Sequence, residues 1–152
     1  MNDDCVFCKI IAGQIPADTV YEDDKVLAFL DINPVSFGHT LIIPKVHHQM
    51  MPDTPDDLVG YVFTKAKHLM VAIKHAMAVD YVVISVVGIE VPHFHVHLVP
   101  RDLDDGLAKF WPTKKYDTDQ AKDIATKIKS SLWKILGNGC RGRSIIGLST
   151  LR

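Results

Sequence analysis

The chain has 152 residues, of which 47% are hydrophobic and 23% are charged, and this length and composition indicate one globular domain. Seventeen basic residues nearly balance eighteen acidic ones, and the net charge of −1 argues against nucleic-acid binding. The longest apolar run, YVVISVVGI, is too short to span a membrane, and the printed sequence shows no secretion signal. An odd count of three cysteines without a secretion signal favours reduced thiols and a cytoplasmic protein, and the short apolar run predicts no membrane attachment.

The first part of the chain predicts three strands. Residues 5–17 are apolar and end in turn-forming glycine and proline. Residues 19–32 predict two short strands around the acidic turn at 22–24. After a loop that contains asparagine, proline and glycine, residues 39–48 predict a third strand, which Pro44 closes.

A long helix and two further strands are predicted next. Residues 54–78 carry apolar side chains at helical spacing, and Thr54 is the predicted N-cap. The β-branched and aromatic residues that follow favour strands over 80–89 and 91–100.

A second helix is predicted over residues 117–136, with Asp117 or Thr118 as its cap and the following glycine, residue 137, as its stop. Residues 138–152 contain no acids and are predicted to form a poorly ordered or peripheral tail. Residues 1–137 would then be one domain. The order of its elements predicts an α+β fold, in which an antiparallel sheet of about five strands carries two main helices.

Three histidines, His93, His95 and His97, alternate along the segment PHFHVHLVP. Because successive residues of a strand face opposite sides, the three rings are predicted to share one face, with Cα atoms about 7 Å apart per step. The outer two Cα atoms would lie ~13 Å apart, which is too far for all three rings to bind one metal through bonds of about 2.0 Å. This spacing favours different roles for the three rings, with one ring acting in catalysis and its neighbours serving other purposes.

Cys5 and Cys8 form a C-x-x-C motif, which can bind a metal or form a redox disulfide. A redox pair is expected at a strand-to-helix turn inside a βαβ unit, whereas this pair lies in the first segment. A structural zinc site needs two further ligands, and His47, His48 and His93 are available to supply them. The spacing therefore favours zinc over two buried thiols.

The segment from His93 to Val99 resembles the His-φ-His-φ-His-φ-φ signature of the histidine triad family, in which φ is an apolar residue. The segments CVFCKIIAGQIPA, VYEDDKVLAFLDI and GHTLIIPKVH are similar to the bacterial, nucleoside-phosphoramidase-like branch of that family. The resemblance implies a nucleotide hydrolase or transferase that acts at the α-phosphate of purine nucleoside phosphoramidates or related nucleotides. It also implies a histidine-triad fold and a homodimer whose two antiparallel sheets join edge to edge.

The resemblance further implies a role for individual residues. His95, the middle histidine, would be the nucleophile and would form a nucleotidyl-histidine. His97 would contact the phosphate and the leaving group, and His39 would support the reacting ring. The same matches imply a structural zinc site and a nucleotide site; the zinc ligands would be Cys5, Cys8, His47 and His93, and the nucleotide contacts would be Asp31, Ile32, Ser85, Gly88 and Glu90.

The chain departs from the common family pattern just before the triad. Ile89 stands where many members have glutamine, and Glu90 stands where they have a small hydroxyl residue. These changes bear on the substrate and the rate more than on the reaction class. Three alternatives therefore stay open: a nucleotide-binding regulatory module with little turnover, a diadenosine polyphosphate hydrolase, and a zinc-stabilised interaction protein.

Overall fold

A computed structural model describes residues 4–107 and 114–136 of the chain. The chain divides into two compact units, Met1–Lys109 and Phe110–Arg152, and we treat each unit separately. The predicted tail, residues 138–152, lies outside the described residues, and the assignment of residues 1–137 to one domain stays a prediction.

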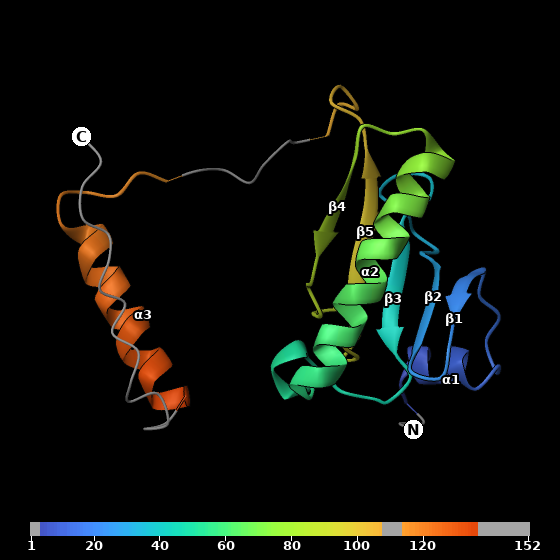
Figure 1. The fold of residues 1–152 in the computed structure, drawn as a ribbon, viewed down its shortest axis with the longest axis horizontal. Coiled ribbons are helices and arrows are strands. Elements are labelled where there is room, and N and C mark those ends of the chain that lie inside the picture. Colours follow the sequence, from blue (N-terminus) through green and yellow to red (C-terminus); the bar gives the residue numbers. More distant parts are fainter. Residues whose placement is uncertain (1–3, 108–113, 137–152) are drawn as a thin grey trace. The chain divides into compact units, whose positions relative to one another are not determined.

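The first unit is built on an antiparallel sheet of five strands, as predicted (Figure 1). The order of the strands across the sheet is β1-β2-β3-β5-β4, so that β5 lies between β3 and β4. Their bounds are β1 Thr19–Glu22, β2 Val26–Leu30, β3 Thr40–Pro44, β4 Tyr81–Ser85 and β5 Val96–Arg101.

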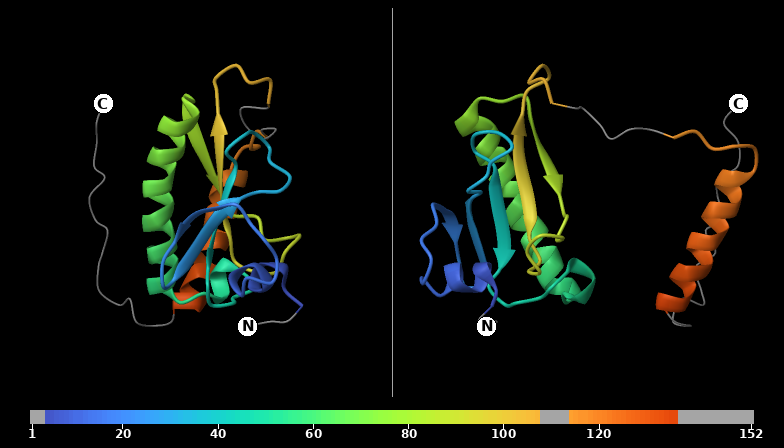
Figure 2. Two further views of the ribbon diagram at one scale, coloured as in Figure 1. Left: turned by 90° about the vertical axis from the view of Figure 1, so that its right-hand side faces the viewer. Right: turned by 180° about the vertical axis from the view of Figure 1, so that it is seen from behind.

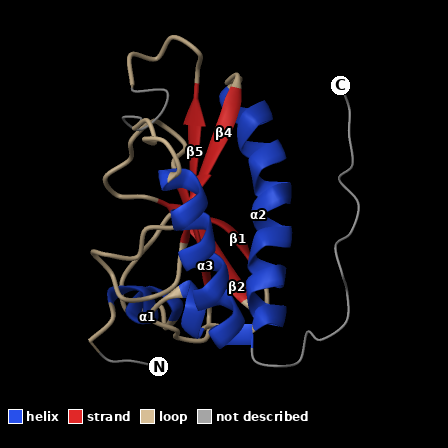
Figure 3. Cartoon of the chain, turned by 90° about the vertical axis from the view of Figure 1, so that its left-hand side faces the viewer, coloured by secondary structure: helices blue, strands red, loops and turns tan. Residues whose placement is uncertain are grey.

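Helices lie on both faces of this sheet. The long helix α2 (Asp56–Met77) covers one face, and the short helix α1 (Val6–Ile11) lies on the other, as the side views in Figures 2 and 3 show. A single 3₁₀ turn, η1 (Met51–Asp53), precedes α2. The prediction of α2 is confirmed, but the first segment is helical where only an apolar segment was expected.

Alternation along the strands produces two separate cores. In β2, Val26 and Ala28 pack toward α2, whereas Leu27 and Phe29 pack toward α1. The neighbouring strand β3 divides its apolar side chains between the two cores in the same way. Since both faces are covered, β2 and β3 are buried along nearly their whole length, which explains their continuous apolar sequences.

Three predicted boundaries are wrong in informative ways. Thr54 does not cap α2, because its hydroxyl donates back to the carbonyl of Met50 and Pro55 occupies the N-cap position. The strand expected over 80–89 ends at Ser85, and the strand expected over 91–100 begins at Val96. Residues between them form a loop that returns the chain to the α1 face.

In the second unit, α3 spans Gln120–Leu136. The helix was expected over 117–136 with Asp117 or Thr118 as cap, but Asp119 has a φ of 66° and interrupts the helical backbone before Gln120. Residue 137, the expected stop, lies outside the described residues. Within residues 4–107 and 114–136, no helix combines the length and apolar character needed to cross a bilayer.

Candidate functional site

His97 is the histidine of the triad that lies within β5. Its Cα pairs with that of Leu41 in β3 and with that of Ser85 in β4. Directly opposed residues in an antiparallel sheet project to the same face. Leu41 belongs to the core beneath α1, so the ring of His97 lies on that side of the sheet too.

His93 and His95 precede β5 and reach the same side by a different route. The ring of Phe7 in α1 packs edge-on against both, with ring centroids 5.9 Å from His93 and 5.2 Å from His95. The predicted sharing of one face therefore holds, but strand alternation accounts for His97 alone. Phe7 was not assigned a role from the sequence, although its position between the two cysteines of C-x-x-C could have suggested one.

The backbone fixes which nitrogen of His95 is free. Its Nδ1 lies 2.5 Å from the carbonyl oxygen of His93. A carbonyl oxygen can only accept, so Nδ1 must carry the hydrogen, and in the neutral ring Nε2 keeps its lone pair. The side chain is 5% exposed. A neutral imidazole nitrogen held in this way is chemically suited to attack an electrophile.

His97 and His39 form a hydrogen-bonded pair. Nε2 of His39 lies 3.0 Å from Nδ1 of His97, and the backbone N–H of Val35 donates to Nδ1 of His39 over 3.3 Å. If His39 accepts at Nδ1, it must donate from Nε2, and His97 then carries its hydrogen on Nε2. We expected His39 to support the ring of His95; its hydrogen bond goes to His97 instead.

Burial keeps this pair uncharged in the free protein. It lowers the pKa of His97 to about 4, and charge on His95 or His39 would lower that pKa further. Burial also lowers the pKa of His39, against the attraction of the Asp31 carboxylate. Both rings are therefore neutral near pH 7 when no anion is bound.

Asp31, at the end of β2, faces this pair, whereas Ile32 does not join it. Oδ2 of Asp31 lies 3.5 Å from Nδ1 of His39, and its Oδ1 accepts the backbone N–H of Asn33 over 2.8 Å. The side chain of Ile32 is 91% exposed on the adjoining surface. The predicted ribose and base contacts thus lie next to each other, one against the histidine pair and the other open to solvent.

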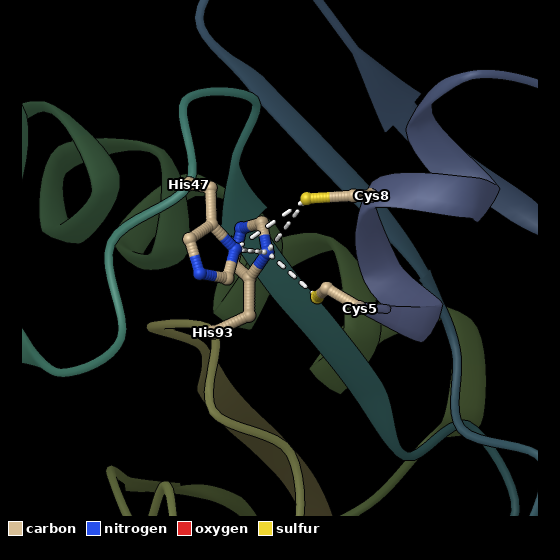
Figure 4. Close-up of side chains that lie close together, drawn as sticks. All are labelled: Cys5, Cys8, His47 and His93. Carbon is tan, nitrogen blue, oxygen red and sulfur yellow. Dashed lines mark hydrogen bonds between the residues drawn. The ribbon is translucent and has the colours of Figure 1, made fainter. Parts of the chain in front are cut away.

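The four predicted metal ligands converge on one point (Figure 4). Cys5 and Cys8 come from the start of α1, His47 from the loop after β3, and His93 from the approach to β5. Their Sγ and Nδ1 atoms all lie within 4.8 Å of one another. Three of the four residues are buried, and the two thiols are free.

The distances fit a tetrahedral metal site. Sγ of Cys5 lies 3.4 Å from Nδ1 of His93, Sγ of Cys8 lies 3.4 Å from Nδ1 of His47, and the two Nδ1 atoms are 3.3 Å apart. Zinc bonds of about 2.3 Å to sulfur and about 2.0 Å to nitrogen place tetrahedral ligands roughly 3.3 to 3.8 Å apart. Two cysteines with two histidines are also a common zinc donor set.

The second ring nitrogen of His93 supports the same arrangement. Its Nε2 lies 2.9 Å from the carbonyl oxygen of Pro44, which can only accept. The hydrogen is therefore on Nε2, and the lone pair of Nδ1 points to the cluster, as metal-binding histidines require. Burial lowers the pKa of His93 to about 4, which keeps the ring in the neutral form that binds metals.

Asp31, His39 and His97 also lie close together, but they do not form a comparable metal site. Asp31 faces Nδ1 of His39, and His97 faces Nε2 on the opposite side of the same ring. One ion cannot occupy both sides of the ring. The 3.0 Å distance between the two rings is that of a hydrogen bond.

The remaining predicted nucleotide contacts lie in and after β4. Ser85 ends the strand opposite His97, and Gly88 has a φ of 68°, a left-handed conformation that suits glycine. Glu90 is exposed and lines a small cavity of about 190 Å³, together with Cys5 and neighbouring residues of the first segment. The structure brings Ser85 to the histidine site and sets Glu90 beside the N-terminal segment.

The chain matches the HIT domain family over residues 12–104. It is 43% identical over 121 residues to an uncharacterized HIT-like protein of Methanocaldococcus jannaschii, covering 76% of this chain and 94% of that protein. It is 38% identical over 137 residues to a Saccharomyces cerevisiae protein named adenosine 5′-monophosphoramidase, covering 84% of each.

Among solved structures, the chain resembles a zinc-bound histidine triad family protein from Mycobacterium smegmatis. The TM-score is 0.66 at 30% identity, over 84% of this chain and 97% of that one. The family match over residues 12–104 includes the three histidines. On its sequence and its fold, the chain belongs to the histidine triad (HIT) family.

Proposed function

We propose that the protein hydrolyses or transfers nucleotides at the α-phosphate through a covalent nucleotidyl group on Nε2 of His95. The observation that carries this proposal is the hydrogen bond from Nδ1 of His95 to the carbonyl of His93, which leaves Nε2 as the free nucleophile. Purine nucleoside phosphoramidates are the proposed substrates, in keeping with the name of the yeast relative.

The proposed reaction has two displacements. Nε2 of His95 attacks the α-phosphorus, and the bond from phosphorus to the leaving group breaks. His97 lies beside it, with ring centroids 4.9 Å apart, and its Nε2–H can donate to the departing group. Water then attacks the phosphorus, the bond between phosphorus and Nε2 of His95 breaks, and the nucleotide is released. Asp31 and Ile32 would contact the ribose and base, and Ser85, Gly88 and Glu90 would border the phosphate.

We also propose that Cys5, Cys8, His47 and His93 hold one structural zinc ion. The buried donors, their tetrahedral spacing and the tautomer of His93 support this proposal. Four protein ligands leave no position for substrate, so the ion would act by joining α1 to the approach of β5. Binding requires reduced thiols, which agrees with the proposed cytoplasmic location.

A homodimer is the proposed assembly. Among the described strands, β4 is an edge of the sheet, and Ile84 within it is 38% exposed. An exposed apolar edge strand is a template for pairing with another strand. Two copies joined through β4 would form one continuous antiparallel sheet.

The central experiment is a single-turnover reaction with an adenosine 5′-phosphoramidate labelled at the α-phosphate. We expect acid-quenched wild-type protein to carry the label on His95, and His95→Ala to carry none and to lose turnover by at least about a hundredfold. His97→Ala and His39→Ala should slow labelling without abolishing it.

His68→Ala is the matched control, because His68 is an exposed histidine on α2 and should leave labelling unchanged. Near-normal turnover by His95→Ala would reject the nucleophile. Tight nucleotide binding without any labelled protein would instead favour the regulatory module, which the exposed Ile89 and Glu90 beside the site motivate.

A further inference from the structure

Nδ1 of His39 lies between two groups with opposite requirements. The backbone N–H of Val35, 3.3 Å away, needs a lone pair on that nitrogen, whereas the carboxylate of Asp31, 3.5 Å away, needs a hydrogen there. Both cannot be satisfied at once. His39 can therefore exchange between a state that accepts at Nδ1 from Val35 and a state that donates from Nδ1 to Asp31, and the second state is a cation whenever Nε2 also carries a hydrogen.

We propose that Asp31 is a positioning residue that holds a proton on His39, for delivery through His97 to the leaving group. This inference rests on the proposed function, and it adds to the ribose contact a second role for Asp31. The chain of contacts runs from Oδ2 of Asp31 to Nδ1 of His39, and from Nε2 of His39 to Nδ1 of His97. Nε2 of His97 is the remaining nitrogen of the chain.

The proton balance closes over one catalytic cycle. When the anionic phosphate binds, the pair takes up one proton from solvent, and His39 becomes cationic against Asp31. As the bond to phosphorus breaks, the leaving amine takes the proton from Nε2 of His97, and the proton on Nε2 of His39 moves to Nδ1 of His97. His39 stays neutral, with its Nδ1–H donated to Asp31.

The second displacement restores the protonated pair, which returns its proton to solvent when the nucleotide leaves. Water attacks the nucleotidyl group on His95 and gives its proton to Nε2 of His97. The proton on Nδ1 of His97 returns to Nε2 of His39. No other proton donor is needed. The positive charge on the pair is stabilised because the pair lies between the Asp31 carboxylate and the bound phosphate.

The surroundings of the pair leave Asp31 as its anionic partner. Among the described residues, the ionisable groups that act on His39 and His97 are Asp31 and His95, besides each other. His95 is fixed by its bond to the backbone and would repel a proton on His97. Asp31 favours the proton on both rings. Its carboxylate is itself held in place by the N–H of Asn33.

Asp31→Asn is a sharp test because it keeps the shape of the side chain and can replace the accepting oxygen that faces His39 with a donating nitrogen. The new amide oxygen can still accept from Asn33, and the amide nitrogen then faces Nδ1 of His39 as a donor, which locks the neutral ring. Asp24→Asn is the matched control, since Asp24 is an exposed carboxylate in the turn between β1 and β2.

Both variants should be assayed in the full chain on two adenosine substrates, a 5′-phosphoramidate of an alkylamine and a 5′-p-nitrophenyl phosphate. The alkylamine needs a proton to depart, and nitrophenolate does not. We expect Asp31→Asn to lower kcat at pH 7 by about tenfold or more on the phosphoramidate and by less than about threefold on the ester. Equal losses on both substrates would mean that Asp31 acts through the ribose alone, and would overturn the proposal.

Nuclear magnetic resonance of the ring nitrogens, recorded with adenosine monophosphate bound, gives a readout independent of turnover. We expect the titration midpoint of the His39–His97 pair to fall by about one pH unit in Asp31→Asn and to stay unchanged in Asp24→Asn. An unmoved midpoint would overturn the proposal. If wild-type protein cleaves neither substrate, the proposed function fails, while this titration still decides whether Asp31 holds the proton.

Discussion

At the scale of single residues, Glu90 is the predicted departure from the family pattern that chemistry can test. A carboxylate 4 Å from a phosphate anion is repelled by about 4 kcal/mol at an effective dielectric constant near 20. If Glu90 borders the bound phosphate, as proposed, it should disfavour polyphosphate substrates and favour those whose leaving group carries positive charge.

We expect Glu90→Gln to raise kcat/KM on diadenosine polyphosphates relative to cationic phosphoramidates, because it removes this repulsion. The ratio of the two values is the measurement, and Asp24→Asn provides the control for a change of net charge alone. If the ratio does not change, the carboxylate lies away from bound nucleotide.

At the scale of elements, α1 connects the proposed metal site to His95, the proposed nucleophile. Cys5 and Cys8 flank Phe7, whose ring packs against both His93 and His95. Holding the two sulfurs thus also holds the aromatic surface on which His95 rests. The proposed zinc would then influence catalysis without contacting substrate.

This connection predicts that Phe7→Leu separates metal binding from turnover. We expect elemental analysis to give one zinc per chain in both wild type and variant, and kcat to fall by roughly tenfold in the variant because the His95 ring loses its packing surface. Phe63→Leu, a partly buried residue of α2 that packs against the core on the other face of the sheet, controls for loss of an aromatic ring. Wild-type protein purified without chelator that contains no metal, or an oxidised Cys5–Cys8 pair, would contradict the zinc assignment.

The sequence predicted the elements that local signals mark. Strands β1, β2 and β3 were expected from apolar and β-branched residues between turn signals, and helix α2 from helical spacing. Helix α1 was missed, because six residues with apolar side chains on several sides show no clear period. The late start of β5 was missed because the bonds that hold His93 and His95 go to the Pro44 carbonyl and to their own backbone, which no side-chain pattern reveals.

The residues of the site were predicted, but the hydrogen bonds that join them were not. The resemblance supplied the candidate histidines and cysteines, and the structure brings the four candidate ligands together. The resemblance could not supply the tautomers of the histidine rings, because these depend on carbonyl oxygens and on the backbone N–H of Val35. The pairing of His39 with His97 likewise depends on the register of β3 against β5.

At the scale of the whole molecule, buried neutral histidines make stability depend on pH. The pKa of His97 is about 4 in the folded protein and 6.5 in an exposed chain. Between these values the unfolded chain binds more protons, so the free energy of unfolding decreases as pH falls. The effect is absent above pH 6.5 and complete below pH 4.

We therefore expect the midpoint of thermal unfolding to be level from pH 8 to about 6.5 and to fall between pH 6.5 and 4. Calorimetry in buffers of matched ionic strength measures it, and His97→Gln should lose part of the slope. Metal release would add to the fall, since protonated His93 cannot bind. Stability that rises on acidification through this window would contradict the pKa direction.

The proposed homodimer gives a second prediction at this scale. Sedimentation at micromolar concentration should give twice the 17.0 kDa mass of the chain. Ile84→Lys, which places a charge on the edge strand β4, should shift the equilibrium toward monomer. Val20→Lys is the matched control, because it places the same charge on β1, the other edge of the described sheet. A wild-type monomer would exclude the assembly.

The register of β3 against β5 sets where this protein can tolerate insertions and deletions. Leu41 lies opposite His97, and a shift of one residue would turn His97 toward α2 and a core valine or leucine toward the site. A deletion of one residue inside Val96–Arg101 would thus turn the side chains on one side of the deletion to the opposite face of the sheet. The loop at 86–92 can change in length without that exchange. Variation in substrate among relatives is therefore expected to accumulate in this loop, while the strand that follows it stays constant in length.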